Sequence, residues 1–134
     1  MTMLTVSDLR DYLDNVAEFS GVTFYAGAIN RNDAECVGLY PRGRSPLPIA
    51  TGGVANTSVW VMPLSILVHW SEDTEECEQQ ANALYQYFLT AGRVTIGSIV
   101  IENFGLLDSG PIDLFRDEHN ICEMTIRLNV MYNI

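Results

Sequence analysis

Two stretches of the chain repeat apolar residues every three or four positions, which is the period of an amphipathic helix. In the first, residues 8–19, Ser7 is placed to cap the N-terminus and Gly21 to end the segment. In the second, Ser71 or Asp73 can act as the cap, and Gly92 stops the helix. The buried stripes are expected to be Leu9, Tyr12, Leu13, Val16 and Ala17 in the first helix, and Cys77, Ala81, Leu84, Tyr85, Phe88 and Leu89 in the second.

Five other segments have the apolar patterns of strands. Residues 22–29 and 36–41 flank a polar turn, and residues 93–103 form a further short segment. Residues 121–132 alternate almost perfectly between apolar and polar side chains, so one face of this strand is expected to be buried. The segment 59–70 is apolar on both faces, which predicts a strand covered on both sides or packed against another subunit. Pro63 lies inside it and implies a bulge or an edge there.

The order of these elements predicts an α+β fold in two layers. Strands that follow one another closely tend to pair antiparallel, so we expect a mainly antiparallel sheet of about four to five strands. Both amphipathic helices are expected on one face of this sheet, which leaves the other face to solvent or to a partner. The 134 residues have the length of one domain, and no linker or repeat divides residues 1–134.

The charge of the chain is strongly one-sided. Seventeen acidic residues stand against seven basic ones, all of them arginine, and the net charge is -10. Such a chain is not expected to bind nucleic acid or an anionic membrane by electrostatic attraction. The apolar run at 59–68 is too short to span a bilayer, and the first residues lack the basic region of a signal peptide. Cys36, Cys77 and Cys122 form no paired motif, so reduced and mostly buried thiols are expected.

The candidate catalytic and metal-binding residues form no recognisable motif. An acidic run covers residues 72–78, but consecutive helical residues point in different directions, and a solvated helix start explains them. Asp113, Asp117 and Glu118 lie near His119 without the spacing of a calcium loop. His69 and His119 are the two histidines, and a structural or surface role is the better interpretation of both. The sequence therefore predicts no catalytic residue, no metal and no cofactor.

The long segment 42–58 is different, because it combines prolines, glycines and two of the seven arginines. Arginine binds carboxylates in a bidentate manner, and the remaining surface is acidic. Arg42 and Arg44 can therefore contact carboxylates of a second copy of the chain, or they are simply solvated. A loop of this length is usually functional or disordered.

Three segments together resemble a known family. They are YPRGRSP at 40–46, SILVHW at 65–70 followed by a helix with an acidic start, and GPIDLFRDEHNICEMTIRLNVMY at 110–132. Their order and spacing, over roughly residues 36–132, resemble the tail terminator proteins of long-tailed bacteriophages, including the group described as minor capsid proteins. Asn120 stands where a glycine is more usual in this pattern, and asparagine also tolerates a left-handed turn.

This resemblance implies a structural protein of the virion with no enzymatic activity and no cofactor. Its members assemble as a ring, usually a hexamer, which caps the tail tube, stops its polymerisation and offers a surface to the head-completion protein. The ring would be assembled in the host cytoplasm and lie at the head-proximal end of the tail, with DNA passing through its channel without specific binding. The residues that match its most conspicuous motif, and that we expect at a subunit interface, are Tyr40, Pro41, Arg42, Arg44 and Pro46.

Two other interpretations remain open from the sequence. One is a head–tail joining or connector subunit of similar shape. The other is a small enzyme or ligand-binding domain that uses the carboxylates of 72–78 or 113–118 together with a histidine. A closed oligomer of about six copies would favour the ring, whereas a monomer or dimer would favour the enzyme.

Overall fold

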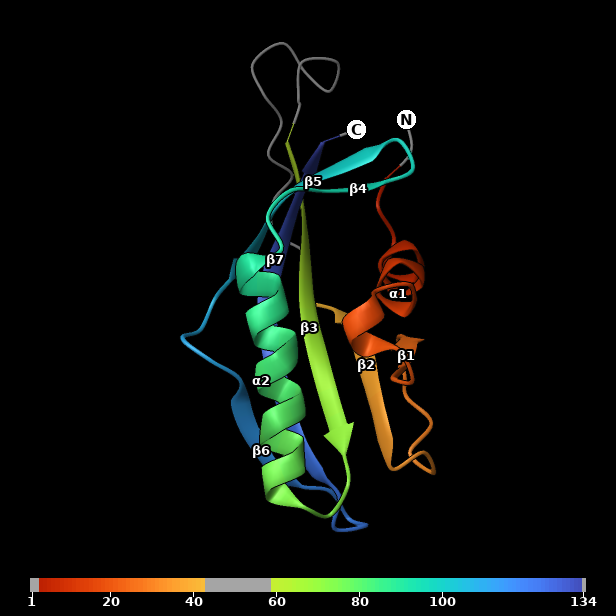
Figure 1. Ribbon diagram of the computed structural model, residues 1–134, viewed down its shortest axis with the longest axis vertical. Helices are drawn as coiled ribbons and strands as arrows, with labels where there is room; N and C mark the ends of the chain where they lie inside the picture. Colours follow the sequence, from red (N-terminus) through yellow and green to blue (C-terminus); the bar gives the residue numbers. More distant parts are fainter. Residues whose placement is uncertain (1–2, 43–58, 134) are drawn as a thin grey trace.

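A computed structural model describes residues 3–42 and 59–133, and Figure 1 shows its elements. Two helices and a short 3-10 turn accompany seven strands. The helical elements are α1 (Val6–Asp14), the 3-10 turn η1 (Ala17–Phe19) and α2 (Thr74–Thr90). The strands are β1 (Thr23–Ala26), β2 (Glu35–Pro41), β3 (Trp60–Trp70), β4 (Val94–Ile96), β5 (Ile99–Leu106), β6 (Ile112–Arg116) and β7 (Cys122–Asn133). Neither helix in the described ranges combines the length and the apolar character needed to cross a bilayer.

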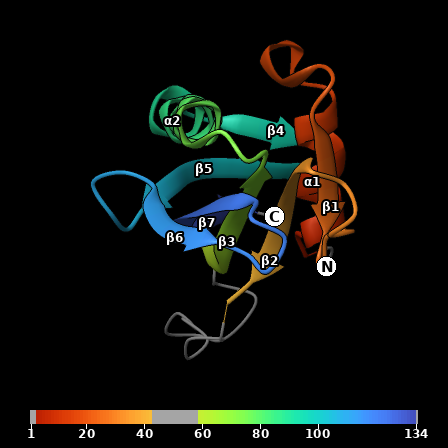
Figure 2. The ribbon, with the colours of Figure 1, turned by 90° about the horizontal axis from the view of Figure 1, so that it is seen from below.

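The α+β class is confirmed, but the sheet is larger than expected and mixed. Its strand order is β1-β2-β3-β7-β5-β4, and β6 pairs with β7 beside this path. All described pairs are antiparallel except β1 with β2, which run parallel. The sheet also curls, as the view along the strands shows (Figure 2). The expected four to five strands are too few, because a turn at Gly97, with φ +59, splits the predicted segment 93–103 into β4 and β5, and the short strand β6 lies outside the predicted segments.

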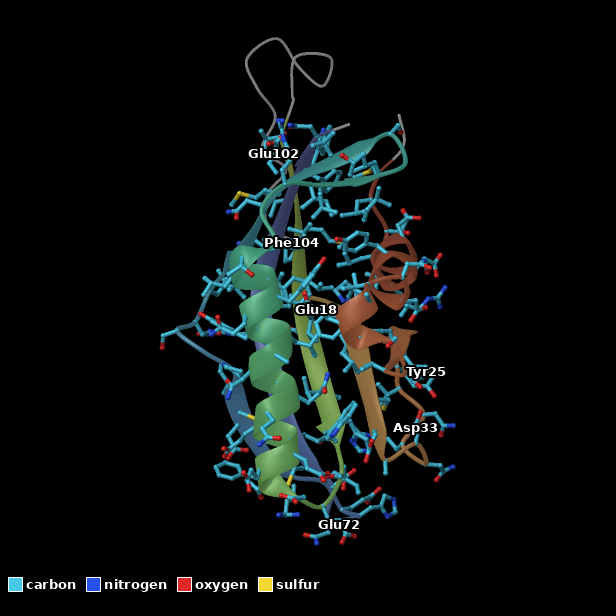
Figure 3. The ribbon with its side chains drawn as sticks, in the orientation of Figure 1. Glu18, Tyr25, Asp33, Glu72, Glu102 and Phe104 are labelled. Atoms are coloured by element: carbon cyan, nitrogen blue, oxygen red, sulfur yellow. The ribbon has the colours of Figure 1, made fainter. Side chains whose placement is uncertain are left out.

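The parallel pairing of β1 and β2 corrects the expectation that neighbouring strands form a hairpin. The connection at residues 27–34 does not turn back beside β1 but crosses one face of the sheet. Gly27, at φ +92, starts this path, and its N–H donates to the carbonyl of Leu39. Figure 3 shows Tyr25 and Asp33 near each other in this region, and the Tyr25 hydroxyl donates to the Asp33 carboxylate over 3.3 Å.

The first helix begins earlier and ends earlier than the sequence predicts. Thr5, not Ser7, is the N-cap, because its hydroxyl accepts from the Asp8 N–H while the Asp8 carboxylate accepts from the Thr5 N–H. The helix stops at Asp14, and Val16 is extended. The reciprocal pair of hydrogen bonds satisfies two backbone donors, so it fixes the helix start more firmly than Ser7 could.

The second helix agrees with its predicted bounds, but Leu89, which was expected in the buried stripe, is 57% exposed. Asp73 is the N-cap and accepts from the N–H groups of Glu75 and Glu76, and Gly92 follows the helix at φ +67. The two helices contact each other through a hydrogen bond between the hydroxyls of Tyr12 and Tyr87. Figures 1 and 2 show them on the same side of the strands.

The core lies between these helices and the sheet. In the register of β3 and β7, Leu64 faces Leu128 and Ile66 faces Ile126, and these four side chains are at most 1% exposed. We call the helix-covered side the first face and the opposite side the second face. Pro63 lies just past the last described β2 pair, and no bulge interrupts β3 against β7. The Pro63 carbonyl still accepts from the Arg42 N–H over 3.0 Å, so within the described residues Pro63 lies neither in a bulge nor at a free edge, and the prediction was wrong in both forms.

Candidate functional site

The second face of the sheet falls into two halves with different surroundings. The closed half contains Cys36, Gly38, His69 and Glu123, all buried, and the connection 27–34 passes over it. The open half contains side chains of β3 and β7 that remain partly exposed, namely Val61, Pro63, Ser65, Asn129 and Met131. The prediction that β3 is apolar and covered on both sides therefore holds for its His69 end only.

Four charged or titratable side chains meet in the closed half, and we call them the buried charge cluster. His69 Nδ1 lies 3.0 Å from Glu123 Oε2, and Arg31 donates to the same oxygen over 2.9 Å. Asp117 Oδ2 lies 3.6 Å from the Arg31 guanidinium and 3.8 Å from His69 Nδ1. His69 is 0% exposed. The cluster thus joins the β1–β2 connection, β3, the β6–β7 turn and β7.

The Asp117 carboxylate is held by more than ion pairing. Burial by itself would raise the pKa of Asp117, but hydrogen bonds from the backbone N–H groups of Ile121 and His119 to its Oδ1 outweigh burial, and the pKa is lowered. The hydrogen bond to Glu123 raises the pKa of Arg31 above its ordinary value. Both shifts favour the charged forms of Asp117 and Arg31, so this pair is charged at neutral pH.

The cluster contains some of the candidate site residues that the sequence analysis named and excludes others. His69 and Asp117 come together, whereas His119 is exposed and lies beside Glu118. Glu123 and Arg31 were missed. Glu123 is one of the polar positions of the alternating segment 121–132, and it lies on the second face, where the connection 27–34 covers it to 9% exposure. Glu123 stands directly opposite His69 in the β3–β7 register, so aligning the two strands could have found this pair.

The donor set has some of the features of a metal site. His69, Asp117 and Glu123 each offer one ligand atom, and these atoms lie within 4.8 Å of one another. Two features oppose that use. The guanidinium of Arg31 already supplies a cation to both carboxylates. His69 Nε2 has no hydrogen-bond partner, whereas a metal-bound histidine almost always donates its other N–H to a fixed acceptor. We therefore interpret the cluster as a network of ion pairs and hydrogen bonds that holds the connection 27–34 against the sheet.

The acidic run at 72–78 serves the start of α2. Asp73 caps the helix, and the Ser71 hydroxyl donates to the Glu76 carboxylate. Within residues 3–42 and 59–133, the run supplies no group of three converging metal-ligand atoms. The expectation of a solvated helix start therefore agrees with the geometry.

The predicted interface motif is only partly described. The Tyr40 hydroxyl accepts from the Ile29 N–H, and Pro41 is the last residue of β2. Arg42 donates to the carbonyl of Leu128 and to the side chain of Asn129, and burial together with the nearby Arg127 lowers its pKa. Arg44 and Pro46 lie outside the described residues. Arg42 is thus anchored on β7 of its own chain, beside the open half.

A groove of about 380 Å³ lies between the N-terminal half of α2 and the β6–β7 pair, and sequence reasoning missed it. We call it the lateral groove. It is lined by Thr74, Cys77, Glu78, Asp113, Phe115, Arg116, Cys122 and Met124. Figure 1 shows β6 alongside the N-terminal part of α2. Burial raises the pKa of the Cys77 thiol to about 12, so this thiol is unreactive at neutral pH.

Phe115 forms one wall of the lateral groove in an unusual conformation. Its φ is +67, and the residue is 74% exposed. The pairing of β6 with β7 shifts register between Asp113 and Arg116, so Phe115 lies in a bulge. The Asp113 carboxylate accepts from the Phe115 N–H over 2.7 Å, and Arg116 donates to the carbonyls of Glu72 and Asn120 over 2.8 Å each. These contacts fix the bulge from both sides.

All three cysteines are free and buried, in agreement with the expectation from their spacing. Comparison of the chain with models of known protein families and with curated proteins found no match.

Proposed function

We propose that this chain is a structural subunit that assembles into a ring, with the role of a phage tail terminator. In this role the ring caps the finished tail tube, stops its polymerisation and presents a joining surface to the head. It works by contacting copies of itself and neighbouring virion proteins, without a catalytic step or a cofactor.

The observation that carries this proposal is the open half of the second face. Val61, Pro63 and Met131 are partly exposed there, on the two longest strands of the sheet. A monomer gains nothing from leaving apolar side chains of its central strands open to water, whereas an assembly buries them. Arg42, Arg127 and Asp108 lie at the same half and give it the polar rim of an interface.

The net charge supports the same role. A ring that DNA passes through should not retain the DNA, and a chain with a net charge of -10 and no lysine repels a polyanion. A ring subunit also needs a lateral contact of the head-to-tail kind, in which two different surfaces of the chain meet. The open half and the lateral groove are two such surfaces, and they share only strand β7.

The enzymatic alternative would rest on the buried charge cluster. His69 is 0% exposed and both carboxylates of the cluster face Arg31, so no position is left for a substrate beside the imidazole. A head–tail joining subunit would use the same surfaces, and the shape of tails assembled without the protein separates it from a terminator.

Two measurements test the proposal. The mass of the purified protein, alone and with its tube protein, should correspond to a closed oligomer of about six copies. Electron microscopy of tails assembled without the protein should then show overlong tubes. Tails of normal length that lack heads would assign the chain to joining instead, and a monomer under all conditions would contradict ring assembly.

A further inference from the structure

The open half carries a positive charge that the described residues do not balance. Arg42, Arg127 and Asp108 lie close together there, and Arg127 donates to both oxygens of the Asp108 carboxylate over 2.7 and 2.9 Å. Arg42 instead donates to the uncharged Leu128 carbonyl and Asn129 side chain, and it makes no ion pair within residues 3–42 and 59–133. These two guanidinium groups and one carboxylate leave a net positive charge in a chain of net charge -10, so the open half suits an acidic partner surface.

Helix α2 presents such an acidic surface on its outer side. Its buried residues face the sheet, so the exposed residues that recur every three or four positions lie on the side away from it. We call them the outer stripe, which consists of Glu75, Glu78, Asn82, Gln86 and Leu89. Neither glutamate of the stripe forms an ion pair within the described part of the chain, and Leu89 is 57% exposed. The outer stripe therefore has free carboxylates at one end and an exposed apolar side chain at the other.

The open half has the complementary groups in the same order and at a similar spacing. On the second face of β7, Arg127 and Met131 are separated by about 13 Å, at ~3.3 Å per strand residue. On the outer stripe, Glu78 and Leu89 are separated by about 17 Å, at ~1.5 Å per helical residue. The long side chains of arginine and methionine can accommodate the difference. A helix laid along β7 can thus place a carboxylate at the arginines and a leucine at the apolar end together.

We propose that the open half receives the outer stripe of α2 from a neighbouring copy of this chain, with Glu78 facing Arg42 and with Leu89 against Met131. This inference rests on the proposed ring and names its lateral contact. Helix α2 covers the first face of its own sheet and the open half is on the second face, so one chain cannot make this contact with itself. The contact joins two different surfaces, as a head-to-tail ring requires.

The first experiment exchanges the charges across the contact. Arg42→Glu and Glu78→Arg each place like charges at every contact, so each variant alone should assemble about 10-fold or more weaker than the parent. Mixed in equal amounts, the two variants should recover assembly to within about 3-fold of the parent, because alternating copies again pair opposite charges at every contact. Mixing does not rescue a variant that merely fails to fold, so recovery reports on the contact.

The matched control is Glu76→Arg, which makes the same change of charge in the same helix. Glu76 is exposed, but it lies two positions from Glu78, and helical residues two apart do not share a face. We expect Glu76→Arg to change assembly by less than about 3-fold and not to rescue Arg42→Glu. Equal rescue by Glu76→Arg and Glu78→Arg would overturn the inference, because it would reflect net charge alone.

The second experiment tests the apolar end of the contact. Copies carrying Leu89→Cys are mixed with copies carrying Met131→Cys under oxidising conditions, and Ala83→Cys replaces Leu89→Cys in the control. Ala83 is exposed on α2 outside the outer stripe, and the three native thiols are buried, so background cross-linking is low. We expect a disulfide-linked pair from the first mixture and none from the control.

The outcomes separate this inference from the proposed function. A parent that assembles, but shows no recovery on mixing or no Leu89→Cys to Met131→Cys link, keeps the ring and rejects this contact. A link between two Met131→Cys copies would place the open halves against each other and would also reject it. A parent that never assembles, alone or with its tube protein, rejects the ring itself.

Discussion

The two halves of the second face differ in how their side chains are covered. In the closed half, the connection 27–34 covers the sheet, and the buried charge cluster fastens it through Arg31, Glu123 and His69. In the open half, residues of the same two strands, among them Val61 and Met131, stay partly exposed. The closed half is buried by residues of its own chain, whereas the open half has the character of a surface that a partner would bury.

This difference predicts which half contributes to the stability of the fold and which half contributes to association. Removing one partner of a buried ion pair strongly lowers the free energy of unfolding, because the other charge is left buried and uncompensated. Substituting a partly exposed side chain changes the free energy of unfolding little, because water replaces the contacts that are lost. Substitutions in the closed half should therefore act on folding, and those in the open half on association.

The largest effect is expected for Glu123→Ala. Its removal leaves the fully buried His69 without its nearest partner and Arg31 without its strongest contact. The free energy of unfolding, measured in urea, should fall by about 3 kcal/mol. The control is Arg127→Ala, on the same strand and the same face but in the open half, where the pair with Asp108 is exposed. A loss as large for Arg127→Ala as for Glu123→Ala would contradict the division into two halves.

A smaller loss is expected for Gly38→Ala. A methyl group there would lie 2.6 Å from Ile29 Cγ2 and 2.7 Å from the Tyr40 ring, so the connection 27–34 must move away from the sheet. We expect a loss of about 1–2 kcal/mol and faster hydrogen exchange at residues 27–34. Gly105→Ala, whose nearest neighbour is 3.3 Å away, should cost less. The prediction fails if exchange in 27–34 does not change.

Asp117 gives the closed half a dependence on pH. Its pKa lies below the ordinary 3.8, so its carboxylate stabilises the fold above that value, and this contribution is lost as the pH falls through about 4 and below. Asp117→Asn should therefore be less stable than the parent at pH 7 and lose less on acidification to pH 3, as urea midpoints at both values would show. Asp108 is the control, because the exposed Arg127 guanidinium lowers its pKa. Salt should reduce the effect of Asp108→Asn and leave that of Asp117→Asn nearly unchanged.

The smallest change in stability is expected for Met131→Gln in the open half. Because Met131 is partly exposed, its replacement should alter the free energy of unfolding by no more than about 0.5 kcal/mol. The mass distribution in solution should nevertheless move toward smaller species, since an amide buried at an interface is poorly compensated. A Met131→Gln protein that is destabilised and still fully assembled would reverse the roles of the two halves.

The sequence predicted the elements whose patterns are long. The second helix, the two long strands β3 and β7, and the buried thiols follow from periodicity and composition alone. The parallel pairing of β1 and β2 did not, because it depends on where the connection 27–34 goes, and that path is set by Arg31 bonding to Glu123, 92 positions away in the sequence. The start of α1 was missed because Thr5 and Ser7 are equally good caps by residue type, and the reciprocal bond with Asp8 decides between them.

The candidate sites were harder to predict than the fold. His69 and Asp117 were singled out separately, and only the register of β3 with β7 and the β6–β7 turn brings them together. The lateral groove has no sequence signal, because Phe115 owes its exposure to a bulge that the pattern of apolar residues hides. Tyr40, Pro41 and Arg42 were named for a contact between subunits, which stays a prediction, and the structure adds contacts of Tyr40 and Arg42 within the chain.

Strand β7 has a consequence for how the chain is made in the cell. It pairs with β3, β5 and β6, and it is the last of the seven strands to leave the ribosome. Until it emerges, β3 and β5 have no common neighbour, and the cluster around His69 lacks Glu123. A polypeptide whose synthesis is interrupted before β7 therefore cannot complete its sheet, so truncated products are left open to proteolysis rather than joining finished copies.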